Sequence, residues 1–563
     1  MLFLITSFYS TAQEKSAIDF ASPLHIPLIV SGTFGEIRTN HFHSGLDIKT
    51  KATIGIPVYS IYDGYVSRVN ISPNGYGKAL YITHPNGYTS VYAHLNELSE
   101  SIDAYITQQQ YIQKSFAIDI NIPQNALSVK RDELIGYSGN TGGSGGPHLH
   151  FEIRETESEK PLNPLLFNFK NKIIDTYKPT LQAVKLYEFD ENKNQINQKN
   201  YWIKKNKNGI ETFGTDTLKI HSPYFSLGVK STDRANFDIN PNGVYSITIE
   251  KSGNIIYQMK MDKLDFDKKR MMNAHVDFKD MKLSNNSIHK CYREPNNTLE
   301  IYPIFKDDGY NFLNENESVS IKIINTDAHE NSNSIQFFIK RESPENIAVQ
   351  PFCNYFLKYN QNNEIDFEGI HINFPNESFY SDLCMLLYTQ NAYGTNVFSK
   401  IYQIHNEYTA IHKNFQLHIL PENLPETLKA KAIIVYENKG KKNAIPSSWL
   451  GISLMGESQE FGKYYITIDT IKPTIQAINF AQNANISNAK ELKLRIADEL
   501  SGIKNIQAYF NGIWLLMEYD PKTKTIQSKG WRNFDQGTNT LNIYIEDNCG
   551  NVNEMQYNLI STM

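Results

Sequence analysis

The chain has 563 residues, of which 40% are hydrophobic and 20% are charged, and its formal net charge is −5 at pH 7. That length predicts about four domains of ordinary size. The slightly acidic balance excludes the broad basic field that nucleic-acid binding requires, so we expect no nucleic-acid partner. The 34 tyrosines and 30 phenylalanines favour strands over helices.

The first thirteen residues resemble a secretory signal. Residues 1–12 carry no charge and are mostly apolar, and a polar run begins at Gln13. An apolar run of this length is too short to span a bilayer, and small residues before a polar run are typical of a cleavage site. A buried N-terminal strand is the alternative, because the basic residues that begin most signals are missing. We expect residues 1–13 to direct export to the periplasm, the cell surface or the medium, and we expect no transmembrane segment.

Short alternating runs over residues 25–170 predict an antiparallel β domain. An Asp-Gly pair at Gly64 and an Asn-Gly pair at Gly87 each separate two apolar runs. Such pairs are the strongest short-range signal of a hairpin, so both positions are predicted to be hairpin turns. A long insertion at 96–133 interrupts the pattern, and it is predicted to contain a short helix around Ile106.

A repeated segment marks the joints between the later domains. Asp-Thr-Tyr-Lys-Pro-Thr at 175–180 recurs as Asp-Thr-Ile-Lys-Pro-Thr at 469–474. Each copy is typical of a proline-stiffened linker before the first strand of a β-sandwich. The matching exits, Asn325–Ala328 and Glu546–Asn551, each precede a final apolar strand. We expect sandwiches that resemble bacterial immunoglobulin-like domains, and hence an all-β, mainly antiparallel fold class. The two outer sandwiches are expected at 178–342 and 470–563. A β-rich module is expected between them, at 343–468.

The cysteines lie outside the first domain. All four occur beyond residue 290, as Cys291, Cys353, Cys384 and Cys549. Their wide spacing matches no metal-ligand pattern. Four cysteines allow three pairings, and a Cys353–Cys384 disulfide is the pairing considered for an oxidising compartment. Buried free thiols are the interpretation that the sequence favours.

Two strands of the first domain are predicted to carry metal ligands. On an extended strand, residues i, i+2 and i+4 share a face, so His43 and Asp47 point the same way. His148, His150 and Glu152 share one face of a second strand. Two strands that meet face to face would offer imidazoles and a carboxylate to one ion. That set, with an open position for water, is typical of catalytic zinc, whereas structural zinc sites are closed and calcium prefers oxygen ligands.

Each of these residues also has an ordinary interpretation. A His-x-His pair is often surface decoration, Asp47 could end a strand, and His94 could be a core histidine. Their combination favours a site. The glycine-rich run at 136–147 lacks the Lys-Ser/Thr pair of a phosphate loop, and it predicts a tight loop beside the ion or substrate. His41 and His84 fall outside the pattern and are interpreted as structural.

The motifs together resemble the LytM/lysostaphin family of zinc endopeptidases, which cut peptide bridges in bacterial peptidoglycan. The resemblance covers residues 30–168 and consists of His-x-x-x-Asp, Tyr-Ala-His-Leu and Gly-Pro-His-Leu-His-Phe-Glu. It implies that the substrate is the stem peptides and crosslinks of peptidoglycan. The insertion at 96–133 departs from the family, because many members have a short connection there.

The resemblance also implies a role for each site residue. It implies one zinc ion per catalytic domain, with three ligands: His43, Asp47 and His150. His94 and His148 become the catalytic pair, one taking the proton of a zinc-bound water and the other stabilising the oxyanion. We favour His148 as the base. Glu152 is interpreted as supporting a ligand without contacting the ion.

Two other functions remain open at the level of sequence. The chain could be a non-catalytic regulator that binds the cell wall on the same fold, or an adhesin-like scaffold whose sandwiches carry the main function. Intact ligand residues argue against the first of these. The C-terminal β-sandwiches are also candidates for binding a protein partner.

Overall fold

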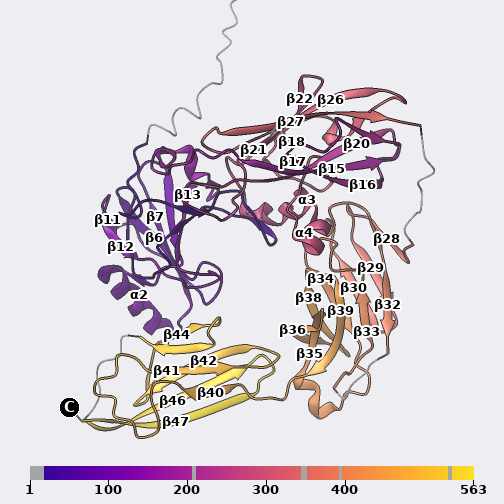
Figure 1. The fold of residues 1–563 in the computed structure, drawn as a ribbon. Helices are drawn as coiled ribbons and strands as arrows, with labels where there is room; N and C mark the ends of the chain where they lie inside the picture. The colour runs from indigo at the N-terminus through magenta and orange to yellow at the C-terminus, as the bar shows by residue number, and fades with distance from the viewer. Residues whose placement is uncertain (1–17, 206–210, 344–351, 392–395, 530–535, 563) are drawn as a thin grey trace, which may run out of the picture. The chain divides into compact units, whose positions relative to one another are not determined.

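The computed structural model is all-β and mainly antiparallel, as the composition predicts (Figure 1). It divides into two compact units, one built mainly from residues before 350 and the other mainly from residues after 351. The expected export signal at 1–13 lies outside the described residues. Within the described part of the chain, no helix is long and apolar enough to cross a membrane. The structure describes residues 18–205, 211–343, 352–391, 396–529 and 536–562.

The first domain is built on a nine-stranded sheet. The central path of that sheet runs β1 (Val30–Gly32), β4 (Leu46–Lys49), β13 (His148–Glu155), β8 (Tyr88–Ala93), β7 (Lys78–Thr83), β6 (Gly64–Ile71) and β10 (Ile118–Asn121). Beside it lie β11 (Ser128–Val129) and β14 (Pro161–Leu162), a small sheet of β5 (Pro57–Tyr59), β12 (Leu134–Tyr137) and β9 (Glu97–Leu98), and the pair β2 (Ile37–Arg38) and β3 (His41–Phe42).

Strand β13 shows why the site faces one side of this sheet. Leu149, Phe151 and Ile153 are fully buried in the core. Because side chains alternate along a strand, the residues between them point to the opposite face. The same alternation therefore places the His-x-His motif on a single face, as predicted.

One of the two predicted hairpins is confirmed and the other is wrong. The turn at Gly87 joins β7 to β8, which pair antiparallel with Thr83 opposite Thr89. At Gly64 the chain instead leaves the small sheet and starts β6 in the large one. A Cβ at Gly64 would clash with the carbonyl oxygen of Thr83. The glycine therefore permits close approach of two strands, and the Asp-Gly pair is not a turn. In the insertion, the predicted helix is confirmed as α2 (Glu100–Gln113).

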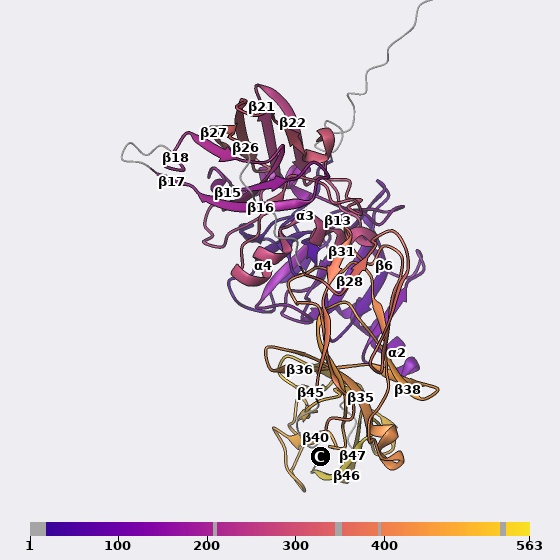
Figure 2. The same cartoon turned by 90° about the vertical axis from the view of Figure 1, so that its right-hand side faces the viewer.

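The second domain consists of two packed sheets, which form separate layers in Figures 1 and 2. One contains β16 (Gln195–Trp202), β15 (Thr180–Phe189), β20 (Tyr224–Thr232), β23 (His289–Lys290) and β25 (Asn311–Phe312). The other contains β19 (Thr217–Ile220), β27 (Ser332–Arg341), β26 (Ser318–Thr326), β21 (Ser246–Lys251), β22 (Asn254–Lys260) and β24 (Ile304–Phe305). The hairpin β17 (Lys204–Lys205) and β18 (Glu211–Thr212) and the helices α3 (Met272–His275) and α4 (Phe278–Ser284) complete it.

The first and second domains contact each other within the first unit. Asn163 donates a hydrogen bond to the Met261 carbonyl over 3.0 Å. Lys49 forms an ion pair of 2.6 Å with the buried carboxylate of Asp238. These contacts hold the first sandwich against the sheet that carries the predicted site.

The second unit contains the middle module and the last sandwich. The module has two five-stranded sheets and the pair β28 (Tyr355–Leu357) and β31 (Leu383–Met385). The first of these sheets consists of β29 (Asn363–Phe367), β30 (Ile370–Phe374), β34 (Phe415–Ile419), β38 (Ser453–Ser458) and β37 (Ser447–Leu450). The second consists of β32 (Leu387–Gln390), β33 (Ile401–Ile404), β39 (Gly462–Ile468), β35 (Ala432–Asn438) and β36 (Lys441–Ile445). The last sandwich packs β40 (Thr474–Ala477), β41 (Lys493–Ala497), β45 (Thr525–Ser528) and β44 (Met517–Asp520) on β43 (Ile513–Trp514), β42 (Ile503–Phe510), β46 (Gly537–Asp547) and β47 (Val552–Ser561).

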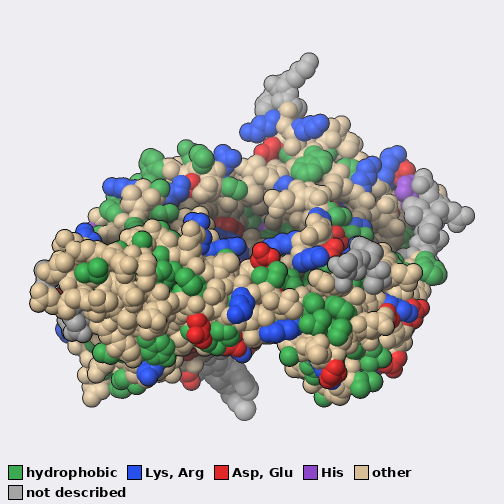
Figure 3. Space-filling model, turned by 90° about the horizontal axis from the view of Figure 1, so that it is seen from below, with side chains coloured by type: hydrophobic (Ala, Val, Ile, Leu, Met, Phe, Trp, Pro, Cys, Tyr) green, Lys and Arg blue, Asp and Glu red, His purple; other side chains and the backbone are tan. Residues whose placement is uncertain are grey.

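The cysteines differ in part from the interpretation that the sequence favoured. Cys353 and Cys384 form a disulfide, because pairing of β28 with β31 brings Phe356 opposite Cys384 and leaves Cys353 near it. Cys291 and Cys549 are buried free thiols, as expected. On the face shown in Figure 3, side chains of both charges are interspersed with small hydrophobic groups.

Candidate metal centre

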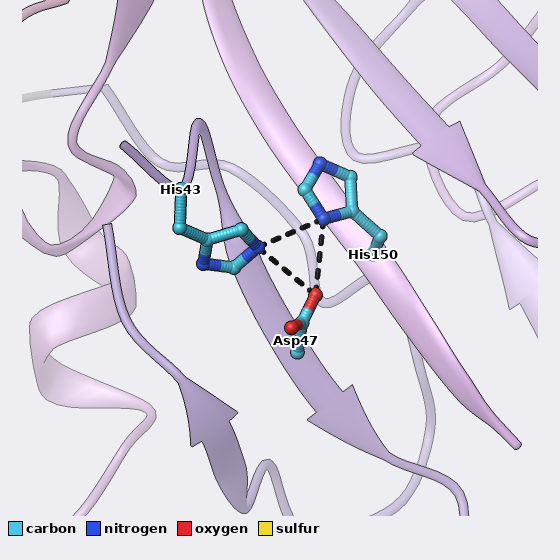
Figure 4. A group of neighbouring side chains, drawn as sticks. All are labelled: His43, Asp47 and His150. Atoms are coloured by element: carbon cyan, nitrogen blue, oxygen red, sulfur yellow. Dashed lines mark hydrogen bonds and ion pairs between the residues drawn. The ribbon is translucent and has the colours of Figure 1, made fainter. Parts of the chain in front are cut away.

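Three side chains of the first domain converge on one point (Figure 4). His43 Nε2 lies 3.1 Å from Asp47 Oδ1 and 3.0 Å from His150 Nδ1. His150 Nδ1 lies 3.0 Å from the same carboxylate oxygen. All three residues are buried. The predicted ligand residues therefore form one compact group of three donor atoms.

The sheet register brings these residues together. Asp47 on β4 and His150 on β13 are directly opposite in the antiparallel pairing. The two strands are neighbours in one sheet, so the prediction that they meet face to face is wrong. His43 lies between β3 and β4 and not on an extended strand. A Cβ at Gly45 would clash with the Phe151 carbonyl oxygen, so this glycine lets the connection pass close to β13.

The hydrogen bonds of the two imidazoles assign their tautomers. His43 Nδ1 donates to the Thr33 carbonyl over 2.8 Å, which leaves a lone pair on Nε2. His150 Nε2 donates to Glu152 Oε1 over 2.8 Å, which leaves a lone pair on Nδ1. Two nitrogen lone pairs and a carboxylate at about 3 Å repel one another unless a cation or a proton lies between them. Two imidazoles and one carboxylate are a donor set that zinc accepts.

Glu152 lies behind His150, one of the candidate ligands. Its Oε1 also accepts hydrogen bonds from Ser44 Oγ at 2.6 Å and Tyr76 Oη at 2.5 Å, and its Oε2 pairs with Arg154 at 2.6 Å. Burial opposes the charge on Glu152, but Arg154 and His150 outweigh burial and hold the pKa of this carboxyl well below its usual range. The carboxylate therefore fixes the ring orientation of His150.

Three members of this group were not predicted. Arg154 follows Glu152 by two residues, so strand alternation could have placed it on the same face. Ser44 lies inside the first motif. Tyr76 gave no sequence signal, because only the pairing of β7, β8 and β13 brings its segment to the site.

The two other predicted histidines lie beside this group of three donor atoms. His148 Nε2 is 3.3 Å from Asp47 Oδ1, and the rings of His94 and His148 have centroids 4.8 Å apart. The side chain of His148 is 17% exposed, against 5% for each of the two histidines in the compact group. The site is therefore most accessible on the side where His148 lies.

The glycine-rich run orients both of these histidines. The Thr141 carbonyl lies 2.9 Å from His94 Nδ1, and the Gly146 carbonyl lies 2.8 Å from His148 Nδ1. Each Nδ1 thus donates its hydrogen and each Nε2 keeps a lone pair. Burial, with the neighbouring His150 and His148, lowers the pKa of His94 to about 3, so this imidazole is neutral at neutral pH.

His41 and His84 lie outside the group, as expected. His41 is exposed and its Nδ1 contacts the Thr39 carbonyl at 2.8 Å. His84 is buried and uses both ring nitrogens, on the Asp63 carbonyl at 2.9 Å and on Ser90 Oγ at 2.8 Å. Burial lowers the pKa of His84 to about 4.

The comparison with known families identifies the first domain. Residues 41–119 and 124–164 match peptidase family M23. The chain contains an M23 peptidase domain. This confirms the resemblance that the three motifs indicated, and the matched ranges include every predicted site residue: His43, Asp47, His94, His148, His150 and Glu152.

The M23 domain is similar to parts of several larger relatives. The DD-carboxypeptidase/endopeptidase Mpg of Neisseria meningitidis serogroup B is 32% identical over 161 residues, which are 27% of this chain and 30% of Mpg. The peptidoglycan DD-endopeptidase ShyA of Vibrio cholerae is 32% identical over 20% of each chain. A solved zinc-containing peptidase from Vibrio cholerae is 28% identical over 25% of this chain and 37% of that one, with a TM-score of 0.19. The chain thus spans less than a third of the length of these curated relatives.

The middle module has a family of its own. Residues 354–469 match the Zu5-like domain. This range largely coincides with the β-rich module expected at 343–468, whose topology the sequence left open. The two five-stranded sheets described above supply that topology.

Proposed function

We propose that the M23 domain is a zinc-dependent endopeptidase that hydrolyses the peptide crosslinks of bacterial peptidoglycan. The observation that carries the proposal is the convergence of His43 Nε2, Asp47 Oδ1 and His150 Nδ1, with His148 beside them on the more exposed side. His148 is not one of the three converging donors, whereas a closed structural site would have a fourth protein ligand. The M23 family and the metalloprotease relatives support metal-dependent peptide hydrolysis.

The relatives also support a substrate. Mpg is named a DD-carboxypeptidase/endopeptidase and ShyA a peptidoglycan DD-endopeptidase. We therefore propose that the bond cut by this chain joins two residues of D-configuration in crosslinked stem peptides. Export follows from this substrate, and the Cys353–Cys384 disulfide supports an oxidising compartment such as the periplasm.

The site residues would divide the chemistry among them. When bound, zinc lowers the pKa of a bound water towards about 7 and polarises the scissile carbonyl. His43, Asp47 and His150 would hold the ion, and Glu152 would keep the second of these imidazoles in the correct tautomer. Their hydrogen bonds would preorganise the site by fixing the orientation of both rings.

His148 is the better candidate for the general base. Its Nδ1–H is held by the Gly146 carbonyl, so its Nε2 can accept a proton from the attacking water. The Asp47 carboxylate, 3.3 Å from Nε2, would stabilise the imidazolium that forms. His94 is neutral, and its Nε2 carries no proton, so it would orient the water by accepting a hydrogen bond from it. To stabilise the oxyanion, His94 would first have to gain a proton on Nε2.

The test is digestion of purified crosslinked peptidoglycan by the full chain, with mass spectrometry of the released fragments. We expect new uncrosslinked stem peptides with the wild-type chain and with His41→Ala, far slower release with His148→Ala, and none after zinc chelation. Binding to peptidoglycan without any release, in a chain with stoichiometric zinc, would contradict the proposal and favour the non-catalytic regulator.

A further inference from the structure

Two groups of three aspartates lie in the sandwiches, outside the M23 domain. In each group the three side chains offer carboxylate oxygens that lie within 4.8 Å of one another. The first aspartate cluster is Asp175, Asp233 and Asp327. The second aspartate cluster is Asp469, Asp498 and Asp547.

The two clusters occupy the same topological position in the two outer sandwiches. Asp175 and Asp469 lie in the repeated linker, shortly before the first strands β15 and β40. Asp233 and Asp498 directly follow the strands β20 and β41, which pair with those first strands. The third member lies at the end of the penultimate strand of each sandwich, after β26 in one and as the last residue of β46 in the other.

The hydrogen bonds of the first cluster connect the linker to the last turn. Asp327 Oδ1 accepts from the backbone nitrogens of His329 at 2.8 Å and Asn331 at 2.9 Å. Asp327 Oδ2 accepts from the Asn331 side chain at 2.8 Å. That same amide donates to the Asp175 carbonyl over 3.2 Å. Two of the three aspartates are thus held in fixed positions by the fold.

The second cluster repeats this arrangement atom by atom. Asp547 Oδ1 accepts from the backbone nitrogens of Cys549 and Asn551, both at 2.8 Å. Asp547 Oδ2 accepts from the Asn551 side chain at 2.7 Å, and that amide donates to the Asp469 carbonyl over 3.0 Å. The same geometry has therefore been kept in two domains whose remaining sequences differ.

In each cluster, one carboxylate oxygen is buried and has no hydrogen-bond partner. These atoms are Oδ1 of Asp233 and Oδ1 of Asp498. Asp233 is only 5% exposed. A buried polar atom without a partner destabilises the folded state, and a charged group does so more strongly. The orphaned oxygen of the buried Asp233 indicates that a ligand belongs in the first cluster. Asp498 is half-buried, and the second cluster carries the same inference through the contacts that it shares with the first.

Neither cluster contains a strong counter-charge from the protein. Among the described residues, His329 Nδ1 lies 4.0 Å from Asp175 Oδ2, and no Lys or Arg forms an ion pair with any of the six aspartates. Beside the second cluster, Lys431 Nζ donates to the Cys549 carbonyl over 3.0 Å and not to a carboxylate of the cluster. Burial and the neighbouring carboxylates raise the pKa of Asp233 to about 8, and burial raises that of Asp175 to about 6. The carboxylates therefore repel one another unless a proton or a cation joins them.

The donor atoms select the kind of cation. All of the side-chain donors are carboxylate oxygens, with no nitrogen or sulfur ligand in either cluster. Zinc prefers nitrogen and sulfur, whereas calcium takes six to eight oxygens in a flexible arrangement that can include water and carbonyls. The first cluster borders a cavity that is also lined by Thr33, Asn163 and Tyr245, which gives room for water ligands.

We propose that each aspartate cluster binds one calcium ion, which joins the linker before the sandwich to the ends of two of its strands. The ion supplies the partner that the orphaned oxygen lacks and removes the repulsion among the three carboxylates. In the first unit it also stiffens the connection between the M23 domain and its sandwich, because Asp175 lies in that connection. The role is structural, and it is separate from the zinc chemistry of the M23 domain.

The test measures calcium binding and thermal unfolding of the full chain after removal of divalent ions with EGTA. We expect equilibrium dialysis to give two calcium ions per wild-type chain, one for each cluster. Asp233→Asn and Asp498→Asn should each lose one ion, and the double variant should lose both. The matched control is Asp190→Asn, in a turn of the first sandwich whose hydrogen bonds are local.

Thermal unfolding keeps the test decisive if binding is weak or a variant is unstable. Calcium should raise the unfolding temperature of the wild-type chain by several degrees, and the double variant should not respond. In EGTA the double variant should be at least as stable as the wild type, because it carries fewer repelling charges. No calcium bound at millimolar concentration, or equal stabilisation by magnesium, would overturn the assignment. Loss of the calcium response in His150→Ala would also overturn it, since the ion would then belong to the M23 site.

Discussion

The candidate ligands of the M23 domain, His43, Asp47 and His150, and the two aspartate clusters hold their side chains at similar spacing but with different donors and neighbours. In the M23 domain, two imidazoles and a carboxylate meet at the paired strands β4 and β13. Two further histidines lie beside them, and the Nε2 atom of each keeps a lone pair. In each aspartate cluster, only carboxylates meet, one from a linker and two from the ends of strands. Donor type selects the ion, and the groups beside the ligands decide whether the ion can support chemistry.

The largest effect should come from removing a ligand. His150→Ala leaves Asp47 and His43 with no third donor, so we expect loss of bound zinc. Crosslink hydrolysis should fall by at least about 10³-fold, because a bound metal ion contributes several kcal/mol to transition-state stabilisation. Elemental analysis and fragment release measure the two effects together. His41→Ala is the control and should change neither, and full activity of His150→Ala would contradict the ligand assignment.

Removing a catalytic histidine should separate chemistry from metal binding. His148→Ala leaves the three ligands in place, so zinc should stay bound at wild-type stoichiometry. Loss of the general base should lower kcat by about 10²- to 10⁴-fold. Steady-state kinetics on a crosslinked muropeptide, with zinc content measured on the same sample, tests this. Loss of zinc from this variant would instead show that His148 is a ligand.

His84 tests what burial alone does to a histidine of this domain. Its folded pKa of about 4 lies below the ordinary value, so the folded state binds fewer protons than the unfolded state between about pH 6.5 and pH 4. The free energy of unfolding should therefore fall by about 3 kcal/mol as the pH drops through that window. Denaturant unfolding of the wild type and of His84→Gln measures it. The variant should show the weaker pH dependence, and equal slopes would contradict the assignment.

The smallest effect should come from the group behind a ligand. Glu152→Gln keeps the shape of the side chain but weakens its hold on the His150 ring, so the Kd for zinc should rise about 10- to 100-fold. At saturating zinc, kcat should change little. Competition with a chelator of known affinity measures the Kd, with the exposed Glu97→Gln as control. An unchanged zinc affinity would show that Glu152 supports the fold and not the ligand.

Most of the site residues could be predicted from the sequence, because they lie in short motifs whose spacing is informative by itself. A spacing of two residues on a strand was enough to put His148, His150 and Glu152 on one face. The strand-end geometry of His43 and the contacts of Tyr76 could not be predicted, because they depend on which strands become neighbours. Pairing of β4 with β13 joins residues about a hundred positions apart.

The aspartate clusters show the same limit. The repeated linkers and exits marked Asp175, Asp327 and their counterparts as parts of a common pattern. Asp233 and Asp498 carried no signal, because the strands that they follow begin at different distances from the two linkers. The prediction of a hairpin at Gly64 was wrong for a related reason. An Asp-Gly pair occurs both in turns and where two strands approach closely, and the sequence does not distinguish the two.

The most direct measurement of the central claim is reconstitution of one metal-free preparation with zinc or with calcium. Release of uncrosslinked stem peptides from peptidoglycan is then followed in each sample. The account predicts that the sample given zinc releases stem peptides. The sample given calcium should show a higher unfolding temperature but no release of stem peptides. Release restored by calcium alone, or absent after stoichiometric uptake of zinc, would contradict the assignment of the M23 site as a zinc endopeptidase.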